Sequence, residues 1–341
     1  MKFITIVVCA YNESLNIYYC LKSLAAIDYP VNKFEVIIID DDSEDETLDI
    51  IKKFIVENKH INFKFYKIKH GGLSIARNTG VKISKNEIIL FVDADAIIDK
   101  DILNQYNIGF ANTDVKIATG KVKNLNLENK EANFIYSMHN YPSLTLATNK
   151  IIGANMAFKR EIFNKYLFFD FFVSRGDETA IIKDIQKDIP KLKVHYFDKA
   201  IVYNETANKI TEWLKKMYIE GQNSTILLYF FSDKFFLKHF TILIKFIYLS
   251  FYVIAIFSFI IPTYVIIIAL LFFILRNFFR IKYILLGVKT VFIRYGFLQS
   301  IKSFFIVNLG IMISDIGSLI PIFTGKKLIR KNSFGTIYTK N

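Results

Sequence analysis

The sequence lacks the patterns of a zinc site, a disulfide-stabilised fold and two common nucleotide-binding loops. Its two cysteines, Cys9 and Cys20, show neither zinc-ligand spacing nor a disulfide framework. Neither G-x-G-x-x-G nor G-x-x-x-x-G-K-[ST] occurs, which leaves dinucleotide-binding and P-loop sites unsupported. No secretory cleavage pattern precedes the first strand pattern, F-I-T-I-V-V. We therefore expect the first 240 residues to stay in the cytoplasm.

Charged and apolar residues are unevenly distributed along the 341 residues. The first 240 are mixed and charged, whereas the rest contains long runs of Ile, Leu, Phe and Tyr with few acids. A net charge of +13 suits either a nucleic acid or an anionic membrane surface. Because apolar segments alternate with Lys and Arg, the membrane is favoured and no nucleic-acid partner is expected.

A buried strand that ends in two carboxylates is the most informative stretch. Ile88–Val92 is a short apolar run rich in β-branched and aromatic residues, typical of a strand covered on both faces. Asp93 and Asp95 follow it directly, at the position where open α/β sheets bind ligands. Carboxylates suit a divalent cation that also holds phosphates. An Asp-rich turn without a ligand is the alternative interpretation.

Strand and helix patterns alternate through the first hundred residues. This order predicts a doubly wound α/β sheet with a nucleotide at its carboxyl edge. The first strand leads into Ala10–Glu13, and the second into the acidic run Asp40–Thr47, which suits a ribose and a base. A helix N-terminus stabilised by acids is the alternative for that run. The predicted strands are Phe3–Val8, Phe34–Ile39, Asn62–Ile68, Ile88–Val92 and Ile151–Phe158, with two short final strands at Lys193–Tyr196 and Ala200–Tyr203.

Two further stretches carry candidate site residues. Arg77 follows the paired glycines Gly71 and Gly72 and offers a planar donor fork for a phosphate or a carboxylate. Asp177 and Glu178 open a helix that runs to about Asp188. Acids at a helix N-terminus are also ordinary capping residues, so both interpretations stand.

Together these motifs resemble the family-2 glycosyltransferases, which have the nucleotide-sugar-binding α/β fold called GT-A. The resemblance covers roughly residues 1–240 and places a GT-A domain with a doubly wound mixed sheet at 1–205. It rests on five ordered motifs: V-V-C-A-Y-N-E-S, I-I-I-D-D-D-S-E-D-E-T, A-R-N-T-G, F-V-D-A-D, and G-A-N-M-A-F followed by R-G-D-E-T.

The resemblance implies roles for individual residues in binding a UDP-, GDP- or dTDP-linked sugar. Asp95 is expected to bind Mn²⁺ or Mg²⁺ on the diphosphate, and Glu178 to act as general base, with Asp177 as the alternative because the order of the acid pair is reversed. The residues implied to bind the donor are Ala10, Tyr11, Glu13, Asp41 at the base, Arg77 beside it, and Asp93 near the ribose.

Two departures from the family pattern affect the prediction. Asn204 stands where many relatives have a histidine, which leaves a protein ligand for the metal there in doubt. The Q-x-x-R-W signature of processive polysaccharide synthases is absent, since Trp213 lies in I-T-E-W-L-K. This absence argues against a polymerising enzyme.

Four segments after residue 205 are predicted to contact a membrane. Residues 206–240 suit interfacial amphipathic helices. Residues 241–282 contain the uncharged run Phe246–Leu275, broken by Pro262, which predicts a transmembrane hairpin or else a single kinked helix. Residues 283–302 suit an interfacial helix, and 303–341 a third membrane segment with a basic tail. We expect a multi-pass protein of the cell membrane with its first domain in the cytoplasm.

The sequence therefore predicts an inverting, metal-dependent glycosyltransferase that adds a single sugar to a lipid or lipid-linked acceptor at the cytoplasmic membrane face. Two alternatives remain open. One is a processive polysaccharide synthase, and the other is a non-catalytic membrane scaffold for glycan assembly.

Overall fold

The computed structural model describes most of the first 219 residues and a few later positions. The described residues are 1–125, 128–138, 151–168, 176–204, 207, 209–219, 306, 309, 313–314, 316, 330–331 and 337–338. The chain divides into two compact units. The first comprises Met1–Asn126, Tyr141–Glu205 and Ile329–Asn341, and the second comprises Leu127–Asn140 and Thr206–Leu328.

The first unit is built on an eight-stranded mixed sheet with the strand order β3-β2-β1-β4-β7-β6-β8-β5. Strands β1 to β4 run parallel, and β7 is antiparallel to both β4 and β6. This arrangement confirms the α/β mixed sheet predicted for the nucleotide-sugar domain. The strands are β1 Ile4–Ala10, β2 Phe34–Asp40, β3 Phe63–Lys67, β4 Ile88–Asp93, β5 Ala96–Ile98, β6 Ile117–Asn124, β7 Asn155–Lys159 and β8 Val194–Asn204.

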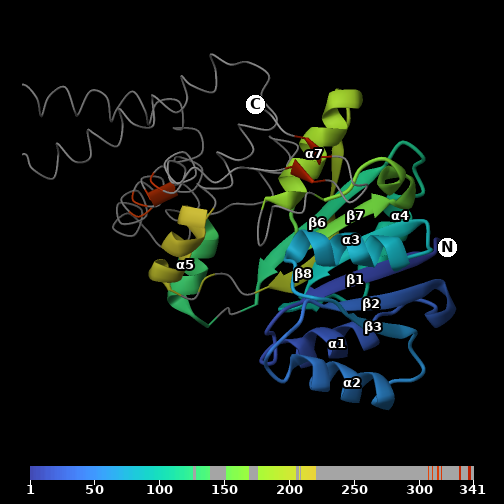
Figure 1. Cartoon of the computed structure of the whole chain (residues 1–341), viewed down its shortest axis with the longest axis horizontal. Coiled ribbons are helices and arrows are strands. Elements are labelled where there is room, and N and C mark those ends of the chain that lie inside the picture. The colour runs from blue at the N-terminus through green and yellow to red at the C-terminus, as the bar shows by residue number, and fades with distance from the viewer. Residues whose placement is uncertain are drawn as a thin grey trace, which may run out of the picture. The chain divides into compact units, whose positions relative to one another are not determined.

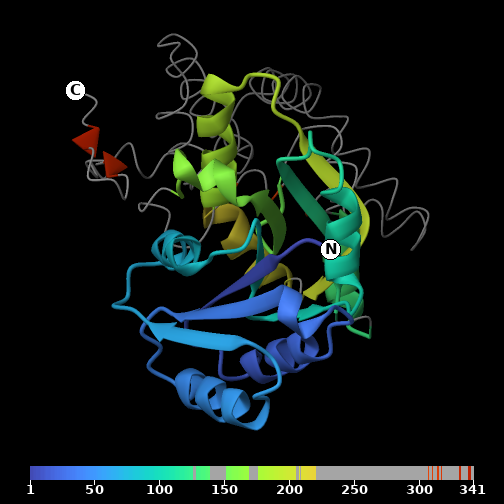
Figure 2. The same ribbon diagram turned by 90° about the vertical axis from the view of Figure 1, so that its right-hand side faces the viewer.

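Helices cover both faces of the sheet, as Figures 1 and 2 show. The helices α1 (Ile17–Ala25), α2 (Thr47–Glu57) and α4 (Ile102–Gly109) pack on one face. The helices α3 (Leu73–Ile83) and α7 (Asp177–Asp188) pack on the other. Short 3-10 turns occupy Val31–Lys33 and Arg160–Asn164.

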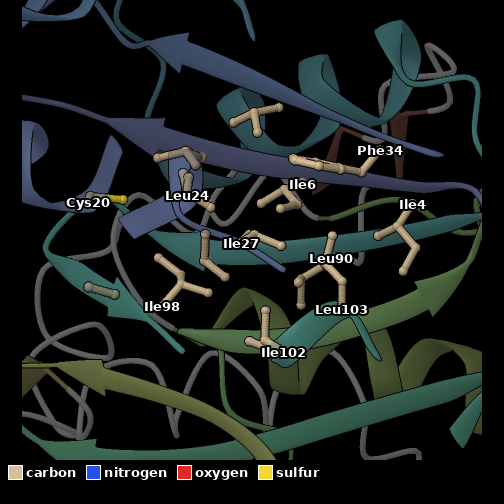
Figure 3. Close-up of a cluster of buried hydrophobic side chains, with 14 of the residues drawn as sticks. Ile4, Ile6, Cys20, Leu24, Ile27, Phe34, Leu90, Ile98, Ile102 and Leu103 are labelled. Atoms are coloured by element: carbon tan, nitrogen blue, oxygen red, sulfur yellow. The ribbon is translucent and has the colours of Figure 1, made fainter. Parts of the chain in front are cut away.

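Alternating side chains of the central strands explain why both faces are covered. Ile4 and Ile6 of β1 and Leu90 of β4 point toward α1 and α4, where Figure 3 shows them packed with Leu24 and Leu103. The intervening residues, among them Val7 and Phe91, enter the opposite core. Successive residues of these strands therefore face opposite layers. Both sets must be apolar, which explains the continuous apolar runs in the sequence.

Helix α3 lies very close to β1. A Cβ atom added to Gly80 would clash with the side chain of Val7, so only glycine allows this approach. The backbone of Phe168 is tied to the same helix, because Asn78 donates to the Phe168 carbonyl at 2.8 Å and accepts from the Phe168 N–H at 2.9 Å.

The end of the sheet differs from the sequence prediction. The two short strands expected at Lys193–Tyr196 and Ala200–Tyr203 are one long strand, β8, with a register shift opposite Gly120 and Lys121 of β6. A strand not predicted from the sequence, β5, follows Asp95 and pairs with β8 in antiparallel register. The prediction was wrong here because the bulge keeps β8 continuous through polar residues that look like a turn.

The second unit contains helix α5 (Lys130–Met138) and a helical stretch at residues 210–219. Trp213, expected at a membrane interface, is buried against Phe134 and Ile135 within this unit. In the part of the chain that the structure describes, no helix has both the length and the apolar character to cross a bilayer. The predicted hairpin at 241–282 and the interfacial helix at 283–302 lie outside the described residues, as does nearly all of 303–341.

Candidate active site

The ends of three adjacent parallel strands bring most of the predicted site residues to one edge of the sheet. Ala10 at the end of β1 pairs with Asp40 of β2, and Cys9 pairs with Asp93 of β4. Tyr11, Glu13 and Asp41 follow directly after these strand ends. The carboxyl edge of a parallel sheet is where open α/β folds bind ligands.

Asp41 is buried and its carboxylate is fully engaged. It accepts hydrogen bonds from the backbone N–H groups of Gly71 at 2.9 Å and Gly72 at 2.8 Å, and His70 Nδ1 lies 3.0 Å from Oδ2. Gly72 has a φ of 88°, a conformation that favours glycine. Asp41 thus fixes the loop His70-Gly71-Gly72 against the end of β2.

This loop places an aromatic pair at the sheet edge. The rings of Tyr11 and His70 lie with their centroids 4.4 Å apart and their planes inclined by 32°. Tyr11 is 42% exposed and the His70 side chain 46% exposed, so both present ring surface to solvent. Aromatic faces of this kind stack on planar groups. His70 was not recognised from the sequence, because no local pattern around it shows that it meets Tyr11.

Ala10 and Glu13 shape the first strand end. Ala10 is buried, and its carbonyl accepts from the Asp41 N–H at 2.9 Å. The Glu13 N–H donates to Thr47 Oγ1 at 2.7 Å, and Glu13 Oε2 accepts from Asn16 Nδ2 at 2.9 Å. Burial raises the pKa of Glu13, whereas the hydrogen bond from Asn16 lowers it.

Arg77 is a buried cation between two carboxylates. Its Nη1 donates to both oxygens of Asp177, at 2.8 and 2.7 Å, while Nη2 lies 3.5 Å from Asp93 Oδ1 and 3.4 Å from the Gly153 carbonyl. Burial lowers the pKa of Arg77, but Asp177 and Asp93 raise it, and the net direction is upward. The resemblance implied a place beside the nucleotide base, which stays a prediction; the contacts of the guanidinium in the structure are with Asp177 and Asp93.

The two acids that open α7 have different surroundings. Asp177 is completely buried, and Arg77 holds both of its oxygens. Glu178 is half-buried, and its Oε2 accepts from the Gly176 N–H at 3.2 Å. Burial and the neighbouring charge of Asp177 raise the pKa of Glu178 to about 7. A carboxyl group with a pKa near neutrality is suited to exchange protons at physiological pH.

Asp95 meets the residue that departs from the family pattern. Asn204 pairs with Ala96 across β8 and β5, and its Nδ2 donates to Asp95 Oδ1 at 3.2 Å. The other amide atom, Asn204 Oδ1, is buried and has no hydrogen-bond partner among the residues that the structure describes. A buried acceptor without a donor costs about 1–3 kcal/mol.

The residues at this corner fit a divalent cation. The carboxylate of Asp95 and the unsatisfied amide oxygen of Asn204 are both hard oxygen donors, the kind that Mg²⁺ and Mn²⁺ prefer. Among the described residues, no group of three or more His, Cys, Asp or Glu side chains gathers as a complete metal site. A cation here would therefore share its coordination with a phosphate-bearing ligand, as Mg²⁺ commonly does.

The geometry of the sheet edge defines a nucleotide-sugar site on a GT-A fold. Known proteins that are similar to this chain belong to the same class. The sequence model of the family described as "Glycosyl transferase family 2" matches residues 5–167. The chain therefore contains a glycosyltransferase family 2 domain, as the sequence motifs predicted.

Two curated relatives are similar to parts of the chain. The poly(ribitol-phosphate) beta-glucosyltransferase of Bacillus spizizenii is 32% identical over 171 residues, 48% of this chain and 26% of the relative. A dolichyl N-acetyl-alpha-D-glucosaminyl phosphate glucuronosyltransferase of Methanococcus voltae is 32% identical over 103 residues, 30% of this chain and 32% of the relative. The chain thus matches about a third or less of the length of these relatives.

One solved structure shows the same fold. The mannosyltransferase PcManGT of Pyrobaculum calidifontis, determined in complex with GDP-Man and Mn²⁺, superposes with a TM-score of 0.61. The superposition covers 95% of this chain and 88% of that protein at 16% sequence identity. A likeness at this identity concerns the fold.

Proposed function

We propose that this chain transfers a single sugar from a nucleotide-sugar donor to a hydroxyl group of a lipid or lipid-linked acceptor, with inversion at the anomeric carbon. The donor is a UDP-, GDP- or dTDP-linked sugar, and the reaction depends on Mn²⁺ or Mg²⁺. The glycosyltransferase family 2 domain at residues 5–167 and the named relatives support this class of reaction.

The observation that carries the proposal is the unequal environment of the two acids at the start of α7. Both oxygens of Asp177 accept from Arg77 Nη1 inside the protein, so this carboxylate is already occupied and is not directed at an acceptor hydroxyl. Glu178 keeps solvent exposure and has a pKa raised to about 7 by burial and by Asp177. We therefore assign the general base to Glu178 and the positioning role to Asp177.

The proposed transfer follows from this assignment. Glu178 takes the proton of the acceptor hydroxyl while the hydroxyl oxygen attacks the anomeric carbon from the face opposite the diphosphate. The bond from that carbon to the diphosphate oxygen breaks, and the nucleoside diphosphate leaves with the bonding electron pair. Attack from the opposite face inverts the configuration, and Glu178 later returns the proton to water.

The remaining residues of the sheet edge bind and orient the donor. Tyr11 and His70 offer ring surfaces for the base, and Asp93 lies next to the Arg77 guanidinium at the position proposed for the ribose. Asp95 would hold the divalent cation, which when bound neutralises the charge that develops on the leaving diphosphate. We therefore propose that the leaving group lies on the Asp95 side and the acceptor on the Glu178 side.

The proposal of a lipid-linked acceptor rests on the named relatives and on the charge and apolar segments of the sequence. The two relatives are named for poly(ribitol phosphate) and for a dolichyl-linked sugar phosphate, and both acceptors carry phosphate groups. The net charge of +13 suits such anionic groups. The apolar and basic sequence after residue 240 favours the lipid-linked acceptor, at the cytoplasmic face of the cell membrane.

A donor screen tests the enzymatic proposal. The purified chain of 341 residues is mixed with Mn²⁺, a panel of nucleotide sugars, and either a polyprenyl-phosphate-linked sugar or a poly(ribitol phosphate) chain. We expect one donor to release nucleoside diphosphate only when the lipid-linked acceptor is present, and the product to carry one added sugar. An equimolar Glu178→Gln sample is the control for contaminating activity.

The other outcomes of this screen are equally informative. Release with poly(ribitol phosphate) alone would replace the lipid acceptor by a polyol phosphate. Long products would indicate a processive synthase. Donor binding in a thermal-shift assay without any release would indicate the non-catalytic scaffold.

The membrane location has its own test. A cysteine introduced by Lys289→Cys is expected to react with an impermeant thiol reagent only in cells opened to the cytoplasm, because the predicted hairpin returns the chain to that side. Labelling from outside intact cells would contradict the hairpin.

A further inference from the structure

We propose that Lys121 and Lys123 of β6 form a subsite for a phosphate group of the acceptor. The inference rests on the proposed transfer and names the chemistry by which the site recognises its acceptor. The two lysines lie in the stretch T-G-K-V-K-N, which is outside the motifs that the sequence analysis singled out.

Strand alternation places both lysines on the face of the sheet that α3 and α7 cover. Ile117, earlier on β6, enters the core to which α7 contributes, and Lys121 and Lys123 follow on the same side of the strand. Val122, between the two lysines, pairs with Val202, which belongs to the opposite core. The two ammonium groups therefore lie on one side of β6, beyond the end of the α7 core.

The first lysine is joined to a short segment that follows the masked connection before β7. The Lys121 carbonyl accepts from Asn155 Nδ2 at 3.2 Å. Two residues earlier on β6, Thr119 Oγ1 accepts from the Ile152 N–H at 3.1 Å. Residues 152–155 are thus held against the part of β6 that carries the lysines.

The same segment reaches the acceptor side of the proposed active site. The Gly153 carbonyl lies 3.4 Å from Arg77 Nη2, and Nη1 of Arg77 binds Asp177, the neighbour of the proposed base Glu178. The donor diphosphate is assigned to the Asp95 side, where a cation would balance its charge. The lysine pair is therefore available to a second anion, on the acceptor.

Neither lysine forms an ion pair with a carboxylate in the part of the chain that the structure describes. Both are half-buried, and Lys123 Nζ lies 5.4 Å from the centroid of the Tyr203 ring. The ring attracts the ammonium group but supplies no countercharge. The edge strand β3 differs, because Lys64 there pairs with Glu35 at 2.7 Å. The positive charge on β6 is thus left for a ligand.

Two ammonium groups on alternate strand residues suit one phosphate. Alternate residues lie about 6.5 Å apart along a strand, and the four-carbon stems let both groups reach an anion between them. Lysine binds phosphate as a compact point charge. The two relatives described above are named for poly(ribitol phosphate) and for a dolichyl-linked sugar phosphate. Phosphate is the chemistry that these two kinds of acceptor share.

Paired substitutions separate charge from packing. Lys121→Gln combined with Lys123→Gln removes both charges, and Lys121→Arg combined with Lys123→Arg keeps them. We expect the glutamine pair to bind a fluorescent polyprenyl-phosphate-linked sugar at least about tenfold more weakly than the native chain, and the arginine pair to retain binding. Lys159→Gln is the matched control, because Lys159 is also a half-buried strand lysine but lies opposite Ile88, at the start of β4.

The experiment measures binding without turnover. Fluorescence anisotropy follows the labelled lipid in detergent micelles as the purified chain of 341 residues is added. A labelled polyprenyl ether of the same sugar, without phosphate, is the second ligand, and labelled poly(ribitol phosphate) is the third. Calorimetric titrations with UDP and GDP in the presence of Mn²⁺ measure the donor side. Melting temperatures show whether each variant folds; single glutamine variants, each with a few-fold expected loss, replace a pair that does not fold.

Each outcome decides the inference. Weaker binding of the phosphate-bearing lipid alone by the glutamine pair, with native-like binding by the arginine pair and Lys159→Gln, supports the subsite. The same pattern with poly(ribitol phosphate) as the only ligand bound also supports it and assigns the phosphate to a polyol chain. Native-like binding by a folded glutamine pair overturns the subsite and leaves the proposed transfer intact.

Two further results would also overturn the subsite alone. Equal weakening for the phosphate-free lipid would show a structural role for the lysines, and weaker binding of UDP or GDP would assign them to the donor. If the native chain binds none of the three acceptor ligands, the proposed acceptor class fails together with the subsite.

Discussion

Two pairs of side chains at the same sheet edge differ in how completely their polar atoms are hydrogen-bonded. Arg77 and Asp177 form a buried ion pair in which both carboxylate oxygens are bound. Asn204 donates one hydrogen bond to Asp95, and its own buried amide oxygen has no partner among the described residues. The first pair is complete in the protein alone, whereas the second has capacity for a ligand. We infer that the acceptor side of the site is preorganised and that the donor side is completed on binding.

The largest effect is expected at the proposed base. Glu178→Gln should lower the rate of transfer by about 10²–10⁴-fold, because the amide cannot take the acceptor proton. Donor affinity should stay native, since the change preserves shape and touches the acceptor side. Transfer rates and calorimetric donor titrations measure the two quantities. A near-native rate for Glu178→Gln together with an inactive, folded Asp177→Asn would move the base to Asp177.

The buried ion pair of Arg77 and Asp177 should contribute to the stability of the fold. Arg77→Met leaves the charge of Asp177 buried without a partner, and we expect a loss of about 3–5 kcal/mol in the free energy of unfolding. The double variant Arg77→Met with Asp177→Asn should recover part of this loss, because it removes the uncompensated charge. Urea unfolding provides the measurement. Equal stability of the single and double variants would show that the pair is not the buried unit described here.

The raised pKa of Glu178 should make the rate of transfer depend on pH. A base must be deprotonated, so the transfer rate should fall about tenfold for each pH unit below about 7 and reach a plateau above it. Asp177→Asn removes a negative charge that raises this pKa, so the inflection should move to lower pH in that variant. Initial rates from pH 5 to 9 test the prediction. An inflection that stays in place would exclude coupling between the two acids.

The smallest effect is expected at the aromatic pair. Tyr11→Ala removes one ring face from the proposed base-binding surface and should weaken donor binding by roughly 0.5–1.5 kcal/mol, a few-fold in affinity. The rate at saturating donor should change little, because Tyr11 is assigned to donor binding and not to proton transfer. Donor titration of Tyr11→Ala and His70→Ala measures the effect. An unchanged affinity in both variants would place the base elsewhere.

Local patterns in the sequence predicted the order of strands and helices and the collection of carboxylates at one edge. Asp41 and Asp93 each follow an apolar run, and parallel strands place such ends together regardless of the details of packing. The family resemblance supplied the roles of Asp95 and Glu178. These inferences needed only the spacing of residues within each motif.

The contacts between motifs could not be predicted in the same way. Arg77 meets Asp177 across 100 positions, and Asp95 meets Asn204 across 109. Both contacts depend on how strands that are distant in the chain line up, including the antiparallel β5 that a three-residue pattern cannot reveal. The pairing of Tyr11 with His70 likewise depends on the loop held by Asp41.

The close approach of α3 to β1 has a mechanical consequence. Gly80 lies one turn after Arg77 and lets the helix settle against Val7 with no side chain between them. The distance of α3 from the sheet determines how far the Arg77 guanidinium extends toward α7. Because Arg77 binds Asp177, it also positions the first turn of α7, which carries Glu178. The absence of a side chain at Gly80 therefore sets the distance between α3 and the sheet. Through Arg77 in the same motif, A-R-N-T-G, this distance also sets where Asp177 and Glu178 lie.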